Sequence, residues 1–144
     1  MNQYPKQIAD YLGVHLIQAH KAHRQQAEEA FHKLGIYPGQ EMILLQLWNE
    51  DGLPQSQCAA CSGVEAPTMT KTLQRMERAG LVERHPDPAD ARVSLVYLTE
   101  QGRALVQPII ASWKQLEEQT VQGLTEAEQA LLKRLLTQVS ANLS

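Results

Sequence analysis

The chain lacks the residue sets that most enzymes and metal proteins need. Among its 144 residues are only two cysteines and five histidines, and no second cysteine pair or nearby histidine completes a four-ligand zinc site around Cys58 and Cys61. A glycine-rich phosphate loop and a nucleophile grouped with a base are both missing. Adjacent acidic pairs such as Glu28 and Glu29 point to different sides of a helix. We therefore expect neither an enzyme nor a protein that holds a metal or cofactor.

Long apolar runs are also missing. The N-terminal residues MNQYPKQ lack the apolar stretch of a signal peptide. The longest apolar cluster, Met42 to Trp48, is interrupted by Gln46 and is far too short to span a membrane. We therefore expect a cytoplasmic protein that makes no membrane contact. With 43% hydrophobic and 20% charged residues, the chain suits one globular domain with its own core.

An excess of positive charge is absent as well. The net charge is −3, which argues mildly against a nucleic-acid partner. Between Glu65 and Arg92, however, five basic residues balance five acidic ones, so the surplus negative charge lies elsewhere in the chain. A DNA-binding surface would therefore depend on where a few cations are placed rather than on bulk charge.

The segment Val64–Leu98 carries the strongest pattern in the sequence. On a helical wheel, one side of its first part is apolar and could pack against a domain: Ala66, Met69, Leu73 and Met76. The other side carries side chains with the reach needed for base edges and phosphates. These candidate DNA-binding residues are Pro67, Thr68, Thr70, Lys71, Gln74 and Arg75, with Arg78 beside them. Gly80 is predicted to follow the helix in the left-handed conformation.

Two short apolar runs follow this helix. Leu81–His85 and Val93–Leu98 are predicted to pair as a β-hairpin. The loop between them contains two prolines and carries Asp90 and Arg92, which we add to the candidate DNA-binding residues. We expect Leu53–Pro54 to add a short edge strand. A polar-faced helix followed by a β-hairpin wing is typical of a winged helix-turn-helix DNA reader.

The remaining segments predict further helices, each with an end signal. The expected ranges are Ile8–Leu34 before Gly35, Pro38–Asn49, Gln55–Ser62, a fifth helix capped by Thr99 and running to about Gln122, and a last helix behind the capping box Thr125–Glu128. The terminal helices carry more apolar surface than a small winged helix can cover, so a second copy of the chain is the expected partner. The fold class is therefore mainly α with a small β-hairpin wing. Residues 1–144 form one domain, with a DNA-binding module at 36–98 and dimerisation helices at 6–35 and 99–144.

The cysteines form the motif C-A-A-C inside the predicted helix Gln55–Ser62. One interpretation makes Cys58 a small core residue and Cys61 an incidental surface thiol. The alternative is a thiol-based redox switch, although an undistorted helix gives poor disulfide geometry. We favour the first interpretation.

The segment Val64–Leu98 and its flanks resemble the MarR family of bacterial transcription regulators. The resemblance is carried by G-V-x-x-P-T-x-T-K from Gly63, by G-L-V-E-R from Gly80, by D-P-x-D-x-R from Asp87 and by L-T-x-x-G-R from Leu98, and it extends over about residues 8–143. The family resemblance implies a homodimer, often a repressor, that binds a palindromic operator in double-stranded DNA. In such a complex Arg92 would reach the minor groove, and Asp90 would orient its guanidinium group or pair with another wing cation.

The family resemblance also implies release from DNA by a small molecule or an oxidant. Two histidines interrupt the alanine-rich stripe of the first helix; they are either partly buried polar groups or the wall of a ligand cavity. A cavity between the first, second and fifth helices would be marked by His15, His23, Trp48 and Trp113, and a family habit of binding aromatic acids suggests a small aromatic or phenolic effector. The chain departs from the family at Glu65, where serine commonly caps the recognition helix. A winged helix used only for protein contacts is the alternative function.

Overall fold

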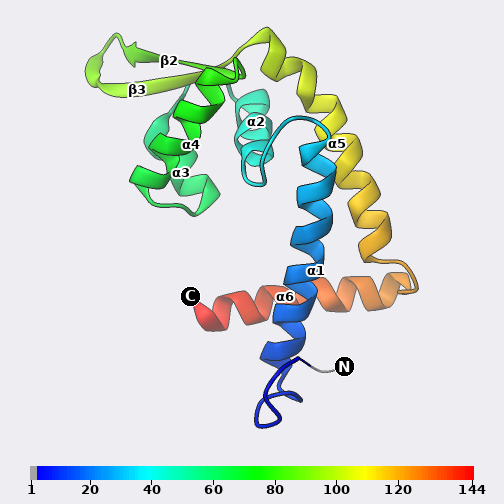
Figure 1. The fold of residues 1–144 in the computed structure, drawn as a ribbon. Helices are drawn as coiled ribbons and strands as arrows, with labels where there is room; N and C mark the ends of the chain where they lie inside the picture. Colours follow the sequence, from blue (N-terminus) through cyan, green and yellow to red (C-terminus); the bar gives the residue numbers. More distant parts are fainter. Residues whose placement is uncertain (1–2) are drawn as a thin grey trace.

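The computed structural model describes residues 3–144 as six helices and one three-stranded antiparallel sheet (Figure 1). The elements are α1 (Leu12–His32), α2 (Gln40–Asn49), β1 (Leu53–Pro54), α3 (Gln55–Ser62), α4 (Ala66–Arg78), β2 (Val82–Asp87), β3 (Asp90–Leu98), α5 (Glu100–Thr120) and α6 (Glu126–Leu143). This arrangement confirms the predicted mainly helical fold with a β-hairpin wing.

The elements separate into a winged-helix end and a helical stem (Figure 1). Helices α2, α3 and α4 and the wing strands β2 and β3 lie together at one end, and α1 and α5 run alongside each other away from it. Helix α6 crosses the far end of this stem. Helix α5 packs against both α1 and α2, so it connects the stem to the winged-helix end. The core residues shared by the two parts include Phe31, Leu44, Leu73, Val96 and Ile109.

Helix α1 is shorter than predicted. It begins at Leu12 rather than Ile8, because Tyr11 is extended at the N-cap position and the preceding residues form turns. Its buried residues are Val14, Ala27 and Phe31, whereas the predicted apolar stripe, including Leu12 and Leu16, is largely exposed. The apolar residues do recur with helical spacing, but many of their side chains face away from the protomer core.

Helix α2 begins at Gln40 instead of at the predicted Pro38. Gly39 takes φ of +97° at the N-cap position, and its N–H donates to Oε2 of Glu41 at 2.7 Å. Glu41 is buried, and the loss of hydration raises the pKa of its carboxyl, partly offset by hydrogen bonds from backbone N–H groups. Trp48, predicted as a marker of a ligand cavity, is 45% exposed.

The wing strands are longer than predicted. Strand β2 includes Pro86 and Asp87, and β3 begins at Asp90, so the predicted long loop shrinks to two residues. Proline is tolerated because β2 lies at an edge of the sheet, whose order is β1-β3-β2. A register shift occurs between Pro86 and Asp87, and Asp87 Oδ1 accepts from the N–H of Ala89 at 2.9 Å to close the turn. Strand β1 pairs with β3, as predicted.

The start of α5 is fastened to the wing. Thr99 caps the helix by accepting from the N–H of Gly102 at 3.0 Å, and its hydroxyl donates to the carbonyl of Gly80 at 2.6 Å. Asp51 accepts from the N–H of Leu98 at 2.9 Å through one oxygen and from Arg103 at 2.6 Å through the other. The predicted cap at Thr99 is therefore confirmed. These contacts fix the direction in which α5 leaves the sheet.

Helix α6 buries none of its residues. The predicted capping box is half formed: Thr125 Oγ1 accepts from the N–H of Glu128 at 3.1 Å, but the Glu128 carboxylate accepts from the Thr125 hydroxyl, at 3.0 Å, in place of the Thr125 backbone N–H. Leu132, Leu135 and Leu136 are each more than 40% exposed, although they recur with helical spacing on one side of the helix. Exposed apolar side chains also gather on the first turns of α1, at Leu12 and Ile17. The apolar faces of both terminal segments are therefore uncovered in the protomer.

Candidate nucleic-acid interface

Helix α4 presents a polar face to solvent and an apolar face to the core. Met69, Leu73 and Met76 are buried, whereas Ala66, predicted on the same face, is exposed because it lies in the first turn at the rim. The N-cap residue Glu65 makes no side-chain capping bond. The helix ends before Gly80, whose φ of +76° confirms the left-handed conformation predicted there.

The predicted polar face of α4 is exposed at nearly every position. Exposed members are Pro67, Thr68, Lys71, Gln74, Arg75 and Arg78. Within residues 3–144, the side chains of Lys71, Gln74 and Arg75 make no hydrogen bond or ion pair. Two long cations and one amide are thus available on this face to donate to an external acceptor.

Thr70 is the exception on this face. It is half-buried; its hydroxyl donates to the carbonyl of Ala66 at 3.0 Å and accepts from Nε2 of Gln55 at 2.7 Å. Its donor is therefore already used inside the protein. This side chain joins α4 to α3, and the DNA contact suggested for it by the sequence stays a prediction.

The wing tip carries a charged pair that points into solvent. Arg92 donates from Nε and from the guanidinium NH2 group to the two oxygens of Asp90, at 3.1 and 3.2 Å, and its backbone N–H donates to the same carboxylate at 3.1 Å. These hydrogen bonds lower the pKa of the Asp90 carboxyl. The Arg92 side chain is 91% exposed. Asp90 therefore orients the guanidinium group without burying it, as the sequence suggested.

Sequence reasoning missed a polar network behind the interface. Arg84 on β2 contacts Glu77 on α4 at 2.6 Å and donates to Oε1 of Gln55 at 3.3 Å. Gln55 in turn reaches Thr70. The partners are separated by 7 to 29 residues in the sequence, so no local pattern connects them. Arg84 is the last residue of the G-L-V-E-R motif, whereas Glu77, Gln55 and Thr70 could not be identified as its network partners from the sequence.

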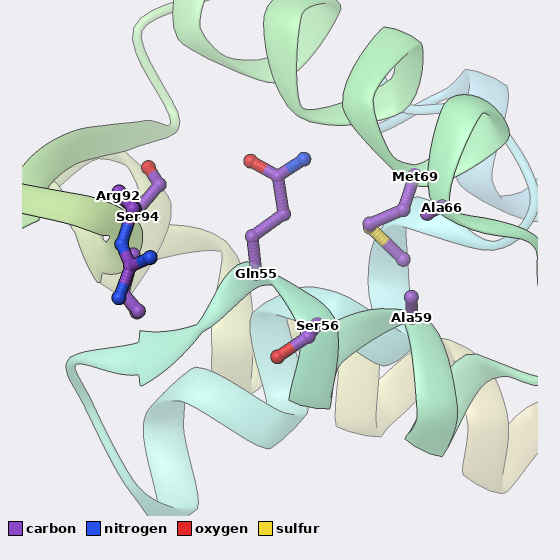
Figure 2. A pocket seen from close by; sticks show the side chains of 8 residues that line it. Gln55, Ser56, Ala59, Ala66, Met69, Arg92 and Ser94 are labelled. Carbon is purple, nitrogen blue, oxygen red and sulfur yellow. The ribbon is translucent and has the colours of Figure 1, made fainter.

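A cavity of about 350 Å³ lies between α3, α4 and the wing. Figure 2 shows the Gln55 side chain standing in it, between Arg92 and Ser94 of the wing and Met69 of α4. The other labelled lining residues are Ser56, Ala59 and Ala66. Gln55 of the polar network and Arg92 of the wing tip therefore border the same hollow.

The four predicted ligand residues are not brought together as one group. His23 and Trp113 lie against each other with ring centroids 6.0 Å apart, and the ring centroid of Phe31 lies 6.3 Å from that of Trp113. The indole N–H of Trp113 is buried and has no hydrogen-bond partner among residues 3–144. His15 is exposed on α1, and Trp48 is exposed near the end of α2. The predicted cavity thus stays a prediction, with its best support at the contact between His23 and Trp113.

The cysteines occupy different environments. Cys58 is buried in the core and Cys61 is exposed, and both are free thiols. Burial, with a smaller contribution from the neighbouring Cys61 thiol, raises the pKa of Cys58, which lowers its thiolate fraction and its reactivity. The predicted placement of both residues is confirmed.

Metal-ligand clusters and membrane-spanning helices are both missing from residues 3–144. No group of three or more histidine, cysteine, aspartate or glutamate residues is placed to hold a metal ion. Among the helices of the same residues, none is both long and apolar enough to cross a membrane.

Comparison with known proteins agrees with this geometry. The MarR family profile matches residues 36–94. The HTH-type transcriptional repressor IacR of Pseudomonas putida is 31% identical over 129 residues, which cover 89% of this chain and 77% of that protein. A solved complex of S. aureus MepR with DNA is 27% identical with a TM-score of 0.82, covering 92% of this chain and 97% of that chain. Bordetella bronchiseptica BpsR, whose DNA binding is described as regulated by 6-hydroxynicotinic acid, is 25% identical with a TM-score of 0.85, covering 95% and 98%.

Proposed function

Because this chain belongs to the MarR family of DNA-binding transcription regulators, we propose that it acts as a homodimeric repressor of a pseudo-palindromic operator. The observation that carries the proposal is the exposed face of α4, where Lys71, Gln74 and Arg75 have no partner within residues 3–144. Donors of this length on the exposed face of a helix suit the major groove. Arg92 on the adjacent wing supplies a further exposed cation.

Each protomer places α4 in one major groove. The two-fold axis of the dimer sets the two recognition helices about one DNA turn apart, ~34 Å, which matches two half-sites of a palindrome. Lys71, Gln74 and Arg75 face base edges and phosphates, while Pro67 and Thr68 bring the start of the helix close to the backbone. Arg92 enters the neighbouring minor groove, where narrow A·T tracts attract arginine.

The dimer is formed by residues 6–35 and 99–144. Leu132 and Leu136 on α6 are exposed in the protomer, and a helix that buries nothing in its own chain needs a partner to cover its apolar face. A second copy of the same surface satisfies this requirement by two-fold symmetry. The DNA-binding module, residues 36–98, then projects from this dimer core.

A small aromatic or phenolic effector is the proposed release signal. Its proposed contact is the region of His23 and Trp113, where a buried indole N–H has no partner within residues 3–144. This region joins α1 to α5, and α5 packs on the winged-helix end. A ligand that binds one arrangement of these helices more tightly shifts the spacing of the two α4 helices. His15 and Trp48 are assigned to the same site with weaker support. The place of action is the cytoplasm, where the DNA of a bacterial cell lies.

The first test is selection of bound fragments from sheared genomic DNA of the host at low salt. We expect enrichment of promoter fragments that share a pseudo-palindrome, because both recognition helices must engage at once. The recovered promoters also point to the chemistry of the effector. Recovery of no DNA above the background of a Lys71→Ala, Arg75→Ala double variant would favour the alternative of a winged helix used for protein contacts.

The second test concerns the dimer. Leu136→Asp places a charge in the proposed apolar seam, and such burial is costly; we expect a monomer in sedimentation experiments. Thr137→Asp is the matched control, because Thr137 is the next residue along the same helix and points to another side. A Leu136→Asp variant that dimerises as tightly as the control would remove α6 from the interface.

A further inference from the structure

Gln55, the first residue of α3, connects three elements of the winged-helix end. Its Nε2 donates to Oγ1 of Thr70 on α4 at 2.7 Å, and its Oε1 accepts from a guanidinium NH1 group of Arg84 on β2 at 3.3 Å. Both ends of the amide are therefore used, and the orientation of the amide is fixed by one donor and one acceptor.

Arg84 receives a second attachment from α4. Its Nε and NH2 groups lie 2.6 Å from Oε1 of Glu77, and the pair is mostly shielded, with side chains 22% and 33% exposed. The guanidinium group is thus held from two directions, by Glu77 and by Gln55. A single contact at Arg84 would allow the wing to tilt relative to α4. The two contacts together, with Glu77 and with Gln55, oppose that tilt.

The wing amplifies a small tilt at its root. Arg84 pairs with Val96 on β3, and Arg92 lies four residues further along the same strand, which is about 13 Å at ~3.3 Å per residue. A tilt of about 10° at Arg84 would displace the tip by roughly 2 Å, which exceeds the tolerance of a hydrogen bond. Strand β1 adds only two residue pairs, at Leu53 and Pro54, near the root.

We propose that Gln55 is a positioning residue that sets the angle between the wing and the recognition helix, so that Arg92 and α4 engage the same DNA at one spacing. This inference rests on the proposed function. Gln55 acts through Arg84 and Thr70 and carries no charge. In Figure 2 its side chain stands in the hollow between the wing residues Arg92 and Ser94 on one side and Met69 of α4 on the other.

The test uses the salt dependence of binding to a recovered operator. Arg92→Ala removes one cation per protomer and lowers the slope of log K against log salt by about one unit for each. Gln55→Ala removes no cation, yet we expect it to lower the slope in the same direction and by a similar amount, because Arg92 loses its place in the groove. In the double variant the slope should fall no further than in Arg92→Ala alone.

Matched variants separate positioning from folding and from direct contact. Gln57→Ala replaces the same residue type two positions along α3, where the side chain is exposed, and should leave the slope unchanged. Thr70→Val keeps the volume but removes the acceptor for Gln55, so it should lower the slope, whereas Thr70→Ser restores the hydroxyl and should restore the slope. Thermal unfolding midpoints identify any variant that is no longer folded.

The outcomes are distinct. A Gln55→Ala protein with the slope of wild type overturns the inference, whether its affinity is unchanged or is reduced by loss of a direct neutral contact. Equal slopes for Thr70→Val and Thr70→Ser also overturn it. If wild type itself binds no DNA, or binds with no dependence on salt, the proposed function fails instead.

Discussion

Gly102 and Leu81 lie so close that a Cβ atom at position 102 would collide with the carbonyl oxygen of Leu81. The same carbonyl accepts a hydrogen bond from the N–H of Thr99 at 3.2 Å, so it cannot simply turn away. Glycine at this position allows the first turn of α5 to pack directly on the root of the wing. The fixed glycine of the L-T-x-x-G-R motif thus has a steric explanation.

Replacing this glycine should separate α5 from the wing. We expect Gly102→Ala to destabilise the fold by about 1–3 kcal/mol, the usual cost of overpacking, and to weaken DNA binding through the displaced wing. Gly13→Ala is the control, because that helical glycine has no atom within 4 Å of an added Cβ and alanine favours helices over glycine. Urea unfolding measures the stability of both variants. Equal stability of the two variants would show that the backbone at Leu81 adjusts freely.

Arg92 and Lys71 should differ in what their loss does to DNA binding. In the proposed complex the wing faces the minor groove, whose hydrogen-bond pattern is degenerate, so Arg92→Ala should weaken binding to all sequences, most of all to sites with A·T flanks. Lys71→Ala should cost ~1–3 kcal/mol on the matched operator and less on scrambled DNA, because lysine can donate to guanine O6 and N7. Titrations with operator and scrambled duplexes at two salt concentrations separate them. Unchanged operator affinity in Arg92→Ala would remove the wing from the mechanism.

The two thiols should react differently. Burial raises the pKa of Cys58, so little thiolate is present near neutral pH, while Cys61 is exposed. We expect iodoacetamide to modify one cysteine in the native protein and two in urea, with native labelling lost in Cys61→Ser. Mild peroxide should leave DNA binding unchanged in wild type and in both serine variants. Release by peroxide that disappears in Cys61→Ser would establish the redox alternative.

Glu41 should make stability depend on pH. Burial raises the pKa of its carboxyl, so the folded chain binds this proton at a higher pH than the unfolded chain does. The contribution of Glu41 to stability therefore increases as the pH falls through the window between the raised pKa and the ordinary value. Glutamine is neutral at every pH, so the unfolding free energy of Glu41→Gln relative to wild type should be larger at pH 7 than at pH 4.5.

Urea unfolding at both pH values and one protein concentration measures this difference. Glu50→Gln, at the other end of the same helix where the residue is exposed, supplies the matched comparison. A relative stability of Glu41→Gln that rose toward pH 4.5 would contradict the assigned direction.

The sequence predicted elements best where a chemical end signal is local. Helix α3 has the predicted range, and α5 and α6 begin behind the predicted threonine caps. Predictions failed at element ends that carry no such signal. The start of α1 depends on turns before Tyr11, and the wing strands extend past Pro86 because β2 is an edge strand.

The candidate site was predicted in the same uneven way. The exposed cations of α4 and the pairing of Arg92 with Asp90 follow from periodicity and a local motif. The role of Thr70 does not, because Gln55 lies 15 residues away in the sequence. Its hydroxyl looks free on a helical wheel, and only the packing of α3 beside α4 shows that it is engaged.

Helix α6 makes the folding of the chain depend on its concentration in the cell. An isolated helix of its length, 18 residues, is only marginally formed in water, and none of its own residues is buried in the protomer. Its order therefore depends on meeting another chain, so dilution should lower helix content and the unfolding temperature should rise with concentration. A newly made, scarce chain would then be both a weak binder of DNA and a ready substrate for proteases, which would set a lower limit on the copy number at which repression operates.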